Sequence, residues 1–308
     1  MFFIKFLSMH CSRTFYMLIQ VSWINKSVRN VLKKARKMIN RYFQIAALIL
    51  IVSSCLLFYS VQVIAGVIKI ETETSITVTD DLLKTSVATT NKGDEAAYNV
   101  QVHLILLGEI QSGPIKAQLN KDQPDTIAFE KTLPALKKGR YPLVVMVDFH
   151  DANQYPFSAV SCATFFFKED ANPGLICLGK DISMGENGKL GFKVKNLESG
   201  SKTVRASLVL PKELSTPISQ SDFRIDAREE KTINFDIKNF SALSGASYPV
   251  FCSFEYDSEE SHFTALANAL VTIKKDENWF NSTKKYWIGA AIILGVMLVA
   301  FQLKRKKP

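Results

Sequence analysis

The chain has 308 residues, of which 47% are hydrophobic and 22% are charged, and its formal net charge is +9. This length suffices for two ordinary domains, and the hydrophobic fraction is too high for a disordered protein. The 14 glycines and 10 prolines are too few for a collagen-like or low-complexity chain.

The positive charge lies at the two ends of the chain. Residues 1–70 contain ten basic and no acidic side chains, and residues 304–307 add four basic ones. Residues 71–303 keep 24 basic against 29 acidic residues, a net charge of −5. Because nucleic-acid binding needs a basic surface on the folded body, this distribution argues against a nucleic-acid partner.

The first apolar segment, residues 43–66, is predicted to be a signal peptide or a transmembrane helix. No charged side chain occurs between Tyr42 and Ile68, which is long enough to cross a hydrocarbon core. Basic residues precede the segment, and Glu71 and Glu73 follow it. The positive-inside rule therefore predicts a basic cytoplasmic segment at 1–42 and an exported body. A basic stretch, an apolar run and small residues near Gly66 are also the layout of a secretory signal.

Two alternatives stay open at this end of the chain. Met38 could be the true start, in which case residues 1–37 are an upstream artefact of gene calling. The segment Val52–Cys55 resembles a lipoprotein box, although the residues after Cys55 stay apolar whereas a mature lipoprotein usually begins with polar residues.

The central body is predicted to be all-β. Apolar and polar residues alternate in 99–106, 190–195 and 232–237. Period-two alternation of this kind indicates strands with one buried and one solvated face, as in antiparallel sheets. Turn signals such as Asn91–Gly93 and Glu198–Gly200 separate the strands.

The body contains an internal repeat with an offset of 105 to 107 residues. Segment 84–91 matches 189–196, 136–143 matches 243–250, and 157–159 matches 263–265. A unit of this length is the size of one sandwich of about seven strands. We therefore expect two tandem β-sandwich domains, at 67–171 and 172–275, joined by the short hinge Asn172–Gly174.

The repeat resembles the CARDB-type (cell-adhesion-related bacterial) Ig-like domains and their relatives in surface-layer-like exported proteins. The pattern consists of an early strand and turn, Val87–Gly93 and Val194–Gly200, and a late Gly-x-Tyr-x-hydrophobic strand; it covers about residues 67–275. The resemblance implies two tandem Ig-like β-sandwiches that are exported, non-catalytic, and contact other macromolecules or space them from the membrane. It supplies no catalytic residues.

After the body, residues 276–285 are predicted to form a polar stalk and residues 286–303 a transmembrane helix. At roughly 1.5 Å per residue this helix spans about 27 Å. The basic tail 304–308 marks its cytoplasmic end. The expected membrane-interface anchors are Trp279, Tyr286, Trp287, Lys304 and Arg305.

The sequence contains no motif of a catalytic, cofactor or metal site, so we expect neither enzymatic activity nor a cofactor. His150 lies close to Asp148 and Asp151, which hints at a metal or a proton relay; a solvated turn is the favoured interpretation. Cys177 and Cys252 could form a disulfide within the second sandwich. Three buried free thiols, Cys162 included, are the favoured alternative, because cysteine packs as a small apolar side chain.

Together these features predict a membrane-anchored bacterial envelope protein whose sandwiches lie in the periplasm or at the cell surface. Its expected role is non-catalytic binding, adhesion or scaffolding, through sandwich-end loops or an exposed edge strand. The expected partners are the lipid bilayer and another envelope protein or a surface polymer. The alternative is an accessory subunit of an envelope export or ABC-type transport complex. Its C-terminal helix would then pack through small residues, namely Gly289, Ala290, Ala291 and Gly295.

Overall fold

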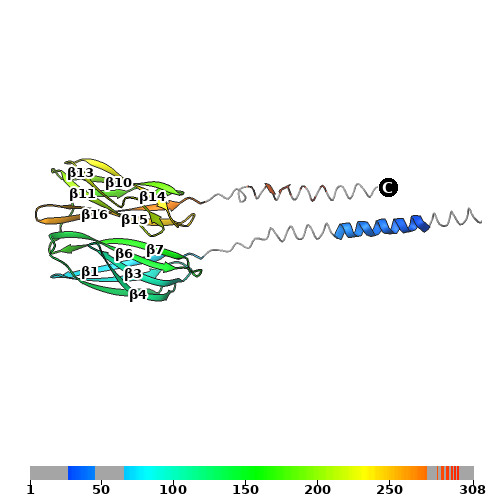
Figure 1. The fold of residues 1–308 in the computed structure, drawn as a ribbon, viewed down its shortest axis with the longest axis horizontal. Coiled ribbons are helices and arrows are strands. Elements are labelled where there is room, and N and C mark those ends of the chain that lie inside the picture. Colours follow the sequence, from blue (N-terminus) through cyan, green and yellow to red (C-terminus); the bar gives the residue numbers. More distant parts are fainter. Residues whose placement is uncertain are drawn as a thin grey trace, which may run out of the picture. The chain divides into compact units, whose positions relative to one another are not determined.

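The computed structural model describes residues 27–45, residues 66–275 and eight helical positions between 283 and 297. Residues 27–45 form a helix. Residues 65–281 form one compact unit, and the two terminal segments belong to another. The body between 66 and 275 is all-β, as the alternating patterns predict (Figure 1).

The first seven strands form a sandwich of two sheets. They are β1 (Ile70–Thr79), β2 (Leu82–Asn91), β3 (Ala97–Leu106), β4 (Glu109–Leu119), β5 (Pro124–Thr132), β6 (Lys138–His150) and β7 (Pro156–Phe167). One sheet has the order β1-β2-β5. In the other sheet β3 lies between β4 and β6, and β7 pairs with β6. Alternate residues of both sheets form a shared core, for example Leu83, Leu104 and Phe165.

The remaining strands form a second sandwich with its own core. They are β8 (Leu175–Gly179), β9 (Ile182–Met184), β10 (Asn187–Asn196), β11 (Lys202–Val209), β12 (Leu214–Ser215), β13 (Gln220–Ile225), β14 (Glu230–Asn239), β15 (Ser247–Asp257) and β16 (Ser261–Ile273). The sheet β12-β14-β10-β8 packs against β13-β11-β15-β16, and β9 adds to β16 in parallel. Phe192, Phe235 and Phe254 meet edge-on in this core.

The two sandwiches have the same strand order. Strands β1, β2 and β5 correspond to β8, β10 and β14, and β4-β3-β6-β7 corresponds to β13-β11-β15-β16. The segments that match in sequence lie in corresponding strands, since 84–91 is in β2 and 189–196 in β10. The repeat in the sequence is therefore also a repeat in strand order; β9 and β12 are additions in the second copy.

A buried asparagine ends the second strand of each repeat. Asn91 and Asn196 are both fully buried. The Asn91 side-chain amide donates to the carbonyls of Glu95 and Leu119, and its oxygen accepts from the Gly93 amide. Asn196 makes the equivalent bonds, donating to the carbonyls of residues 200 and 226 and accepting from the amide of residue 198. Each asparagine thus satisfies backbone groups that the turn leaves unpaired.

A tyrosine near the start of the sixth strand also recurs. The Tyr141 hydroxyl donates to the carbonyl of Lys137 at 2.8 Å, and the Tyr248 hydroxyl accepts from the amide of Leu243 at 2.9 Å. Burial, followed by the charge of Asp257, raises the pKa of Tyr141 to about 12. Both phenols fix the corner that leads into their strand.

The two sandwiches are joined by paired backbone and by buried polar contacts. The start of β16 runs parallel to the start of β6, with His262 opposite Gly139. Gly139 has a φ of 140°, and a Cβ there would collide with the His262 carbonyl oxygen. Glu213, which is 1% exposed, accepts hydrogen bonds from the amide and the hydroxyl of Ser158, each at 2.7 Å.

In the part of the chain that the structure describes, no helix combines the length and apolar character that a membrane crossing requires. The predicted membrane segments 43–66 and 286–303 lie mostly outside the described residues. The anchors Trp279, Lys304 and Arg305 lie outside them too. Tyr286 and Trp287 are helical, with 78% and 53% of their surface exposed.

Candidate functional site

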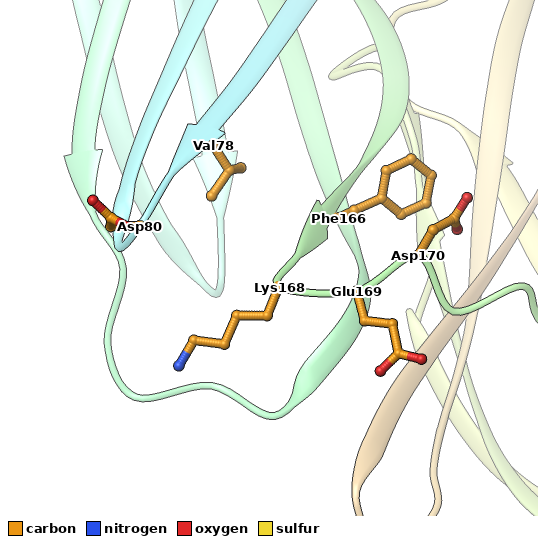
Figure 2. A pocket seen from close by; sticks show the side chains of 6 residues that line it. All are labelled: Val78, Asp80, Phe166, Lys168, Glu169 and Asp170. Atoms are coloured by element: carbon orange, nitrogen blue, oxygen red, sulfur yellow. The ribbon is translucent and has the colours of Figure 1, made fainter.

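A hollow of about 420 Å³ lies at one end of the first sandwich, between the β1–β2 turn and the segment that follows β7 (Figure 2). It is lined by Val78, Asp80, Phe166, Lys168, Glu169 and Asp170. A second hollow, of about 490 Å³, adjoins it at Asp80 and extends along the start of β2. We call the two together the end hollow.

Backbone conformation places these side chains at the rim. Asp80 and Asp81 form the two-residue connection between β1 and β2, and Asp80 has a φ of 53°. Aspartate tolerates this left-handed conformation better than most residues, which suits it to the turn. Lys168 has a φ of 62°, and it turns the chain away from β7. Figure 2 shows Asp80 at the tip of the β1–β2 turn and Lys168 on the segment that follows β7.

Strand alternation leaves one aromatic ring of the hollow in solvent. Phe165 and Phe167 face the core and are at most 2% exposed, whereas Phe166 between them is 41% exposed. The guanidinium of Arg140, the residue opposite Phe166 in β6, packs 4.8 Å from the centre of its ring. The same guanidinium donates to Asp170 at 3.2 Å. Phe166 is therefore held in place while its outer face stays open.

The carboxylates of the hollow fall into two groups. Asp170 pairs with Arg140, and Glu169 pairs with Lys138 at 2.8 Å, a hydrogen bond that raises the pKa of Lys138. Among the described residues, Asp80 and Asp81 have no ion-pair partner. Lys168 also lines the hollow and has no ion-pair partner among the described residues, but the carboxylates of Asp80 and Asp81 outnumber its single positive charge. The end hollow thus combines an open aromatic ring with a net negative charge, which favours a ligand that carries positive charge.

The structure separates the residues that the sequence placed near His150. Asp151 lies in the turn after β6, where its carboxylate accepts from the amides of Asn153 and Tyr155 at 2.8 Å each. Asp148 contacts His103 of β3 instead, at 3.1 Å. In the described part of the chain, no group of three or more His, Cys, Asp or Glu side chains has the arrangement of a metal site.

The sequence analysis missed the network around His103. Its other ring nitrogen bonds Ser112 at 2.8 Å, and Lys212 of the second sandwich donates to Asp148 at 2.5 Å. The order Ser–His–Asp is that of a hydrolase triad. However, Lys212 shares the carboxylate, and Ser112 is exposed on edge strand β4. The contacts tie three strands of the first sandwich to the second one. The sequence carries no signal for the contact between His103 and Asp148, because 45 residues separate them.

The thiols of Cys162, Cys177 and Cys252 are free. Burial raises the pKa of Cys162 and of Cys177 to about 12 each, and it raises that of Cys252 as well. Because the thiolate is the reactive form, these thiols are inert near neutral pH. The structure therefore does not contain the disulfide between Cys177 and Cys252 that the sequence left open.

Comparison with known proteins gives no family for this chain. No family model and no curated protein matches it. Among solved structures, Escherichia coli alpha-2-macroglobulin activated by porcine elastase aligns at 9% identity and a TM-score of 0.28, over 71% of this chain and 23% of that chain. Red sea bream transglutaminase aligns at 11% identity and a TM-score of 0.23, over 67% of this chain and 31% of that chain. The chain thus spans less than a third of either protein, and likenesses this distant identify neither a family nor a function.

Proposed function

We propose that the protein is a membrane-anchored bacterial envelope protein whose two tandem Ig-like domains lie outside the cytoplasm and bind a partner without catalysis. The Ig-like assignment is supported by the three-on-four strand arrangement that the two sandwiches share, to which the second adds β9 and β12, and by the corner tyrosines Tyr141 and Tyr248. The apolar segments 43–66 and 286–303, with basic residues on their outer flanks, support the anchoring and the topology.

The observation that carries the binding role is the end hollow. Loops at the ends of a sandwich are where such folds usually carry their binding residues, since the sheets hold them in place. The end hollow joins a fixed, open aromatic ring, Phe166, to the acidic turn Asp80–Asp81. Among the two partner classes expected from the sequence, these features favour a basic segment of another envelope protein over a neutral surface polymer.

The contacts between the sandwiches support a scaffolding role beside the binding role. The Glu213–Ser158 hydrogen bonds are buried, and the Thr264 hydroxyl donates to the Arg140 carbonyl at 2.8 Å across the junction. Arg140 also positions Phe166. The junction therefore supports the residue that shapes the end hollow.

A photo-crosslinking amino acid at Phe166 tests the binding role in cells that produce the full chain. Leu270, which is 38% exposed on β16, is the matched control position in the second sandwich. We expect a defined adduct from position 166 only, and we expect it to disappear with Asp80→Asn and Asp81→Asn. Equal adducts from both positions, or none from position 166, would contradict the proposal. An adduct with a permease subunit would favour the transport-accessory role instead.

Protease added to intact cells or spheroplasts tests the location. We expect the body between residues 66 and 275 to be cleaved without permeabilisation. Cleavage only after the cells are permeabilised would refute the proposed topology.

A further inference from the structure

Residues 27–45 form a continuous helix (Figure 1). Every residue of this helix is exposed. At about 1.5 Å per residue the helix is roughly 28 Å long. It extends three residues into the predicted membrane segment 43–66, and all its charged residues are basic. Its exposed surface calls for a separate account.

One face of this helix is apolar along its whole length. The apolar positions recur at intervals of three and four residues, and at 100° per residue they cover an arc of roughly 140°, wide enough for a helix that buries one face. They are Val28, Val31, Leu32, Ala35, Met38, Ile39, Tyr42 and Phe43. The large side chains among them are each at least 50% exposed. A soluble surface rarely leaves a stripe of this size in water.

The opposite face is basic and polar. It carries Arg29, Lys33, Lys34, Arg36, Lys37 and Arg41, together with Asn30, Asn40 and Gln44. Six cations within thirteen residues exclude burial of this face in hydrocarbon. A helix with large apolar side chains on one face and Lys and Arg on the other has the composition of a helix that lies in a membrane interface.

We propose that residues 27–45 form an interfacial helix that lies on a membrane leaflet rich in anionic lipids. The apolar stripe enters the boundary between headgroups and acyl chains, and the basic face contacts the lipid phosphates. Charge selects this occupant, because cations without any acidic neighbour on the helix complement an anionic surface. The inference deepens the proposed function: under the proposed topology this leaflet is the cytoplasmic one, while the acidic body lies on the other side.

The test uses the full chain reconstituted into vesicles of phosphatidylcholine alone or of phosphatidylcholine with phosphatidylglycerol. An environment-sensitive fluorescent amino acid replaces Leu32 on the apolar face or, as the matched control, Lys33 on the basic face. With phosphatidylglycerol we expect iodide to quench the probe at position 32 roughly five-fold less than at position 33. Added salt should reduce this difference, because it screens the attraction to the phosphates.

Charge variants sharpen the test. The double change Lys33→Gln and Lys37→Gln, with the probe at position 32, should remove most of the protection from iodide in anionic vesicles. Asn30→Gln and Asn40→Gln change the same face without changing its charge and should keep the protection. Equal quenching at positions 32 and 33, or equal protection with and without phosphatidylglycerol, would overturn the inference.

The same vesicles separate this inference from the proposed function. Resistance of the chain to alkaline extraction reports whether it is anchored in the bilayer. An anchored chain whose position 32 stays open to iodide contradicts the interfacial helix alone. An extractable chain whose position 32 is protected only on anionic vesicles contradicts the anchoring alone.

Discussion

The two sandwiches share their strand order, but one pair of equivalent positions separates the copy that we assign to binding from the other. In the first sandwich Arg140 lies opposite Phe166, and the cation packs on an open ring beside the end hollow. In the second, Ser247 lies opposite Thr272, and their hydroxyls hydrogen-bond at 2.9 Å. The fold needs only a compatible cross-strand pair at this place. The aromatic ring and its cation are therefore a property of the first copy, which is why we assign the binding role to it.

The largest effect is expected at the buried asparagines, which the two copies share. Asn91→Ala or Asn196→Ala leaves buried backbone groups without partners, so each change should lower the free energy of unfolding by roughly 3 kcal/mol. Denaturant unfolding followed by circular dichroism measures the loss. Asn187→Ala, at an exposed position of β10, is the control and should have little effect. A large loss in only one copy would show that the two turns are not equivalent.

The next effect concerns the junction between the copies. Ser158→Ala removes the hydroxyl that donates to the buried Glu213 carboxylate and accepts from the Lys212 amide. We therefore expect a loss of about 2 kcal/mol in the free energy of unfolding and earlier unfolding of one sandwich than the other. The measurement is the unfolding of the full chain by heat, with limited proteolysis to assign the transitions. Ser161→Ala, also on β7, is the control, since the Ser161 hydroxyl bonds Thr72 within the first sandwich. Identical transitions in both variants would contradict a junction role for Ser158.

The corner tyrosines should give a smaller and similar effect in both copies. Tyr141→Phe and Tyr248→Phe each remove one hydrogen bond to the backbone, and each should cost about 1 kcal/mol. Because the pKa of Tyr141 is raised to about 12, ionisation disfavours the folded state. Stability should therefore fall as the pH rises from about 10 through 12. This fall should be weaker in Tyr141→Phe, as unfolding at several pH values would reveal; an unchanged slope would exclude Tyr141 as its source.

The smallest expected effect is the change of stability with pH that comes from His262. This histidine belongs to the second copy and has no counterpart in the first. Burial opposes protonation of this side chain, but hydrogen bonds and charge from Glu255 and Asp257 outweigh it and raise its pKa above 6.5. Its ring also stacks on Tyr141 across the junction, at 4.2 Å. The stabilisation is fully present below pH 6.5 and is lost as the pH rises through the folded pKa. We expect this contribution to the free energy of unfolding to be less than about 1 kcal/mol.

Unfolding of His262→Gln measures this response, since the variant should lose stability at acidic pH and little at pH 9. The Lys137 ammonium lies 3.6 Å from the Asp257 carboxylate and interacts with it at both pH values. The variant is therefore compared with the wild-type protein, in which Lys137 is unchanged. An equal loss at both pH values would mean that His262 acts through packing alone.

The sequence was sufficient to predict the all-β body and the repeat, because both follow from local patterns. Alternation in 99–106 matches β3, and the asparagine turns match the ends of β2 and β10. For the binding site, the sequence predicted only a general location, namely the loops at the sandwich ends or an exposed edge strand. The residues of the end hollow could not be named, since Asp80 and Phe166 are 86 residues apart and meet only through the packing of two sheets.

The chain by itself therefore determined strand periodicity, turn chemistry, the repeat and the segregation of positive charge to the ends. Periodicity and turn chemistry depend on neighbours in sequence, and the repeat and the charge distribution are visible in the sequence itself. Tertiary structure alone decided that Asp148 bonds His103 of β3, that Glu213 is buried against Ser158, and that Arg140 holds Phe166 at the end hollow. These contacts depend on the register and packing of strands far apart in the chain, which no local pattern encodes.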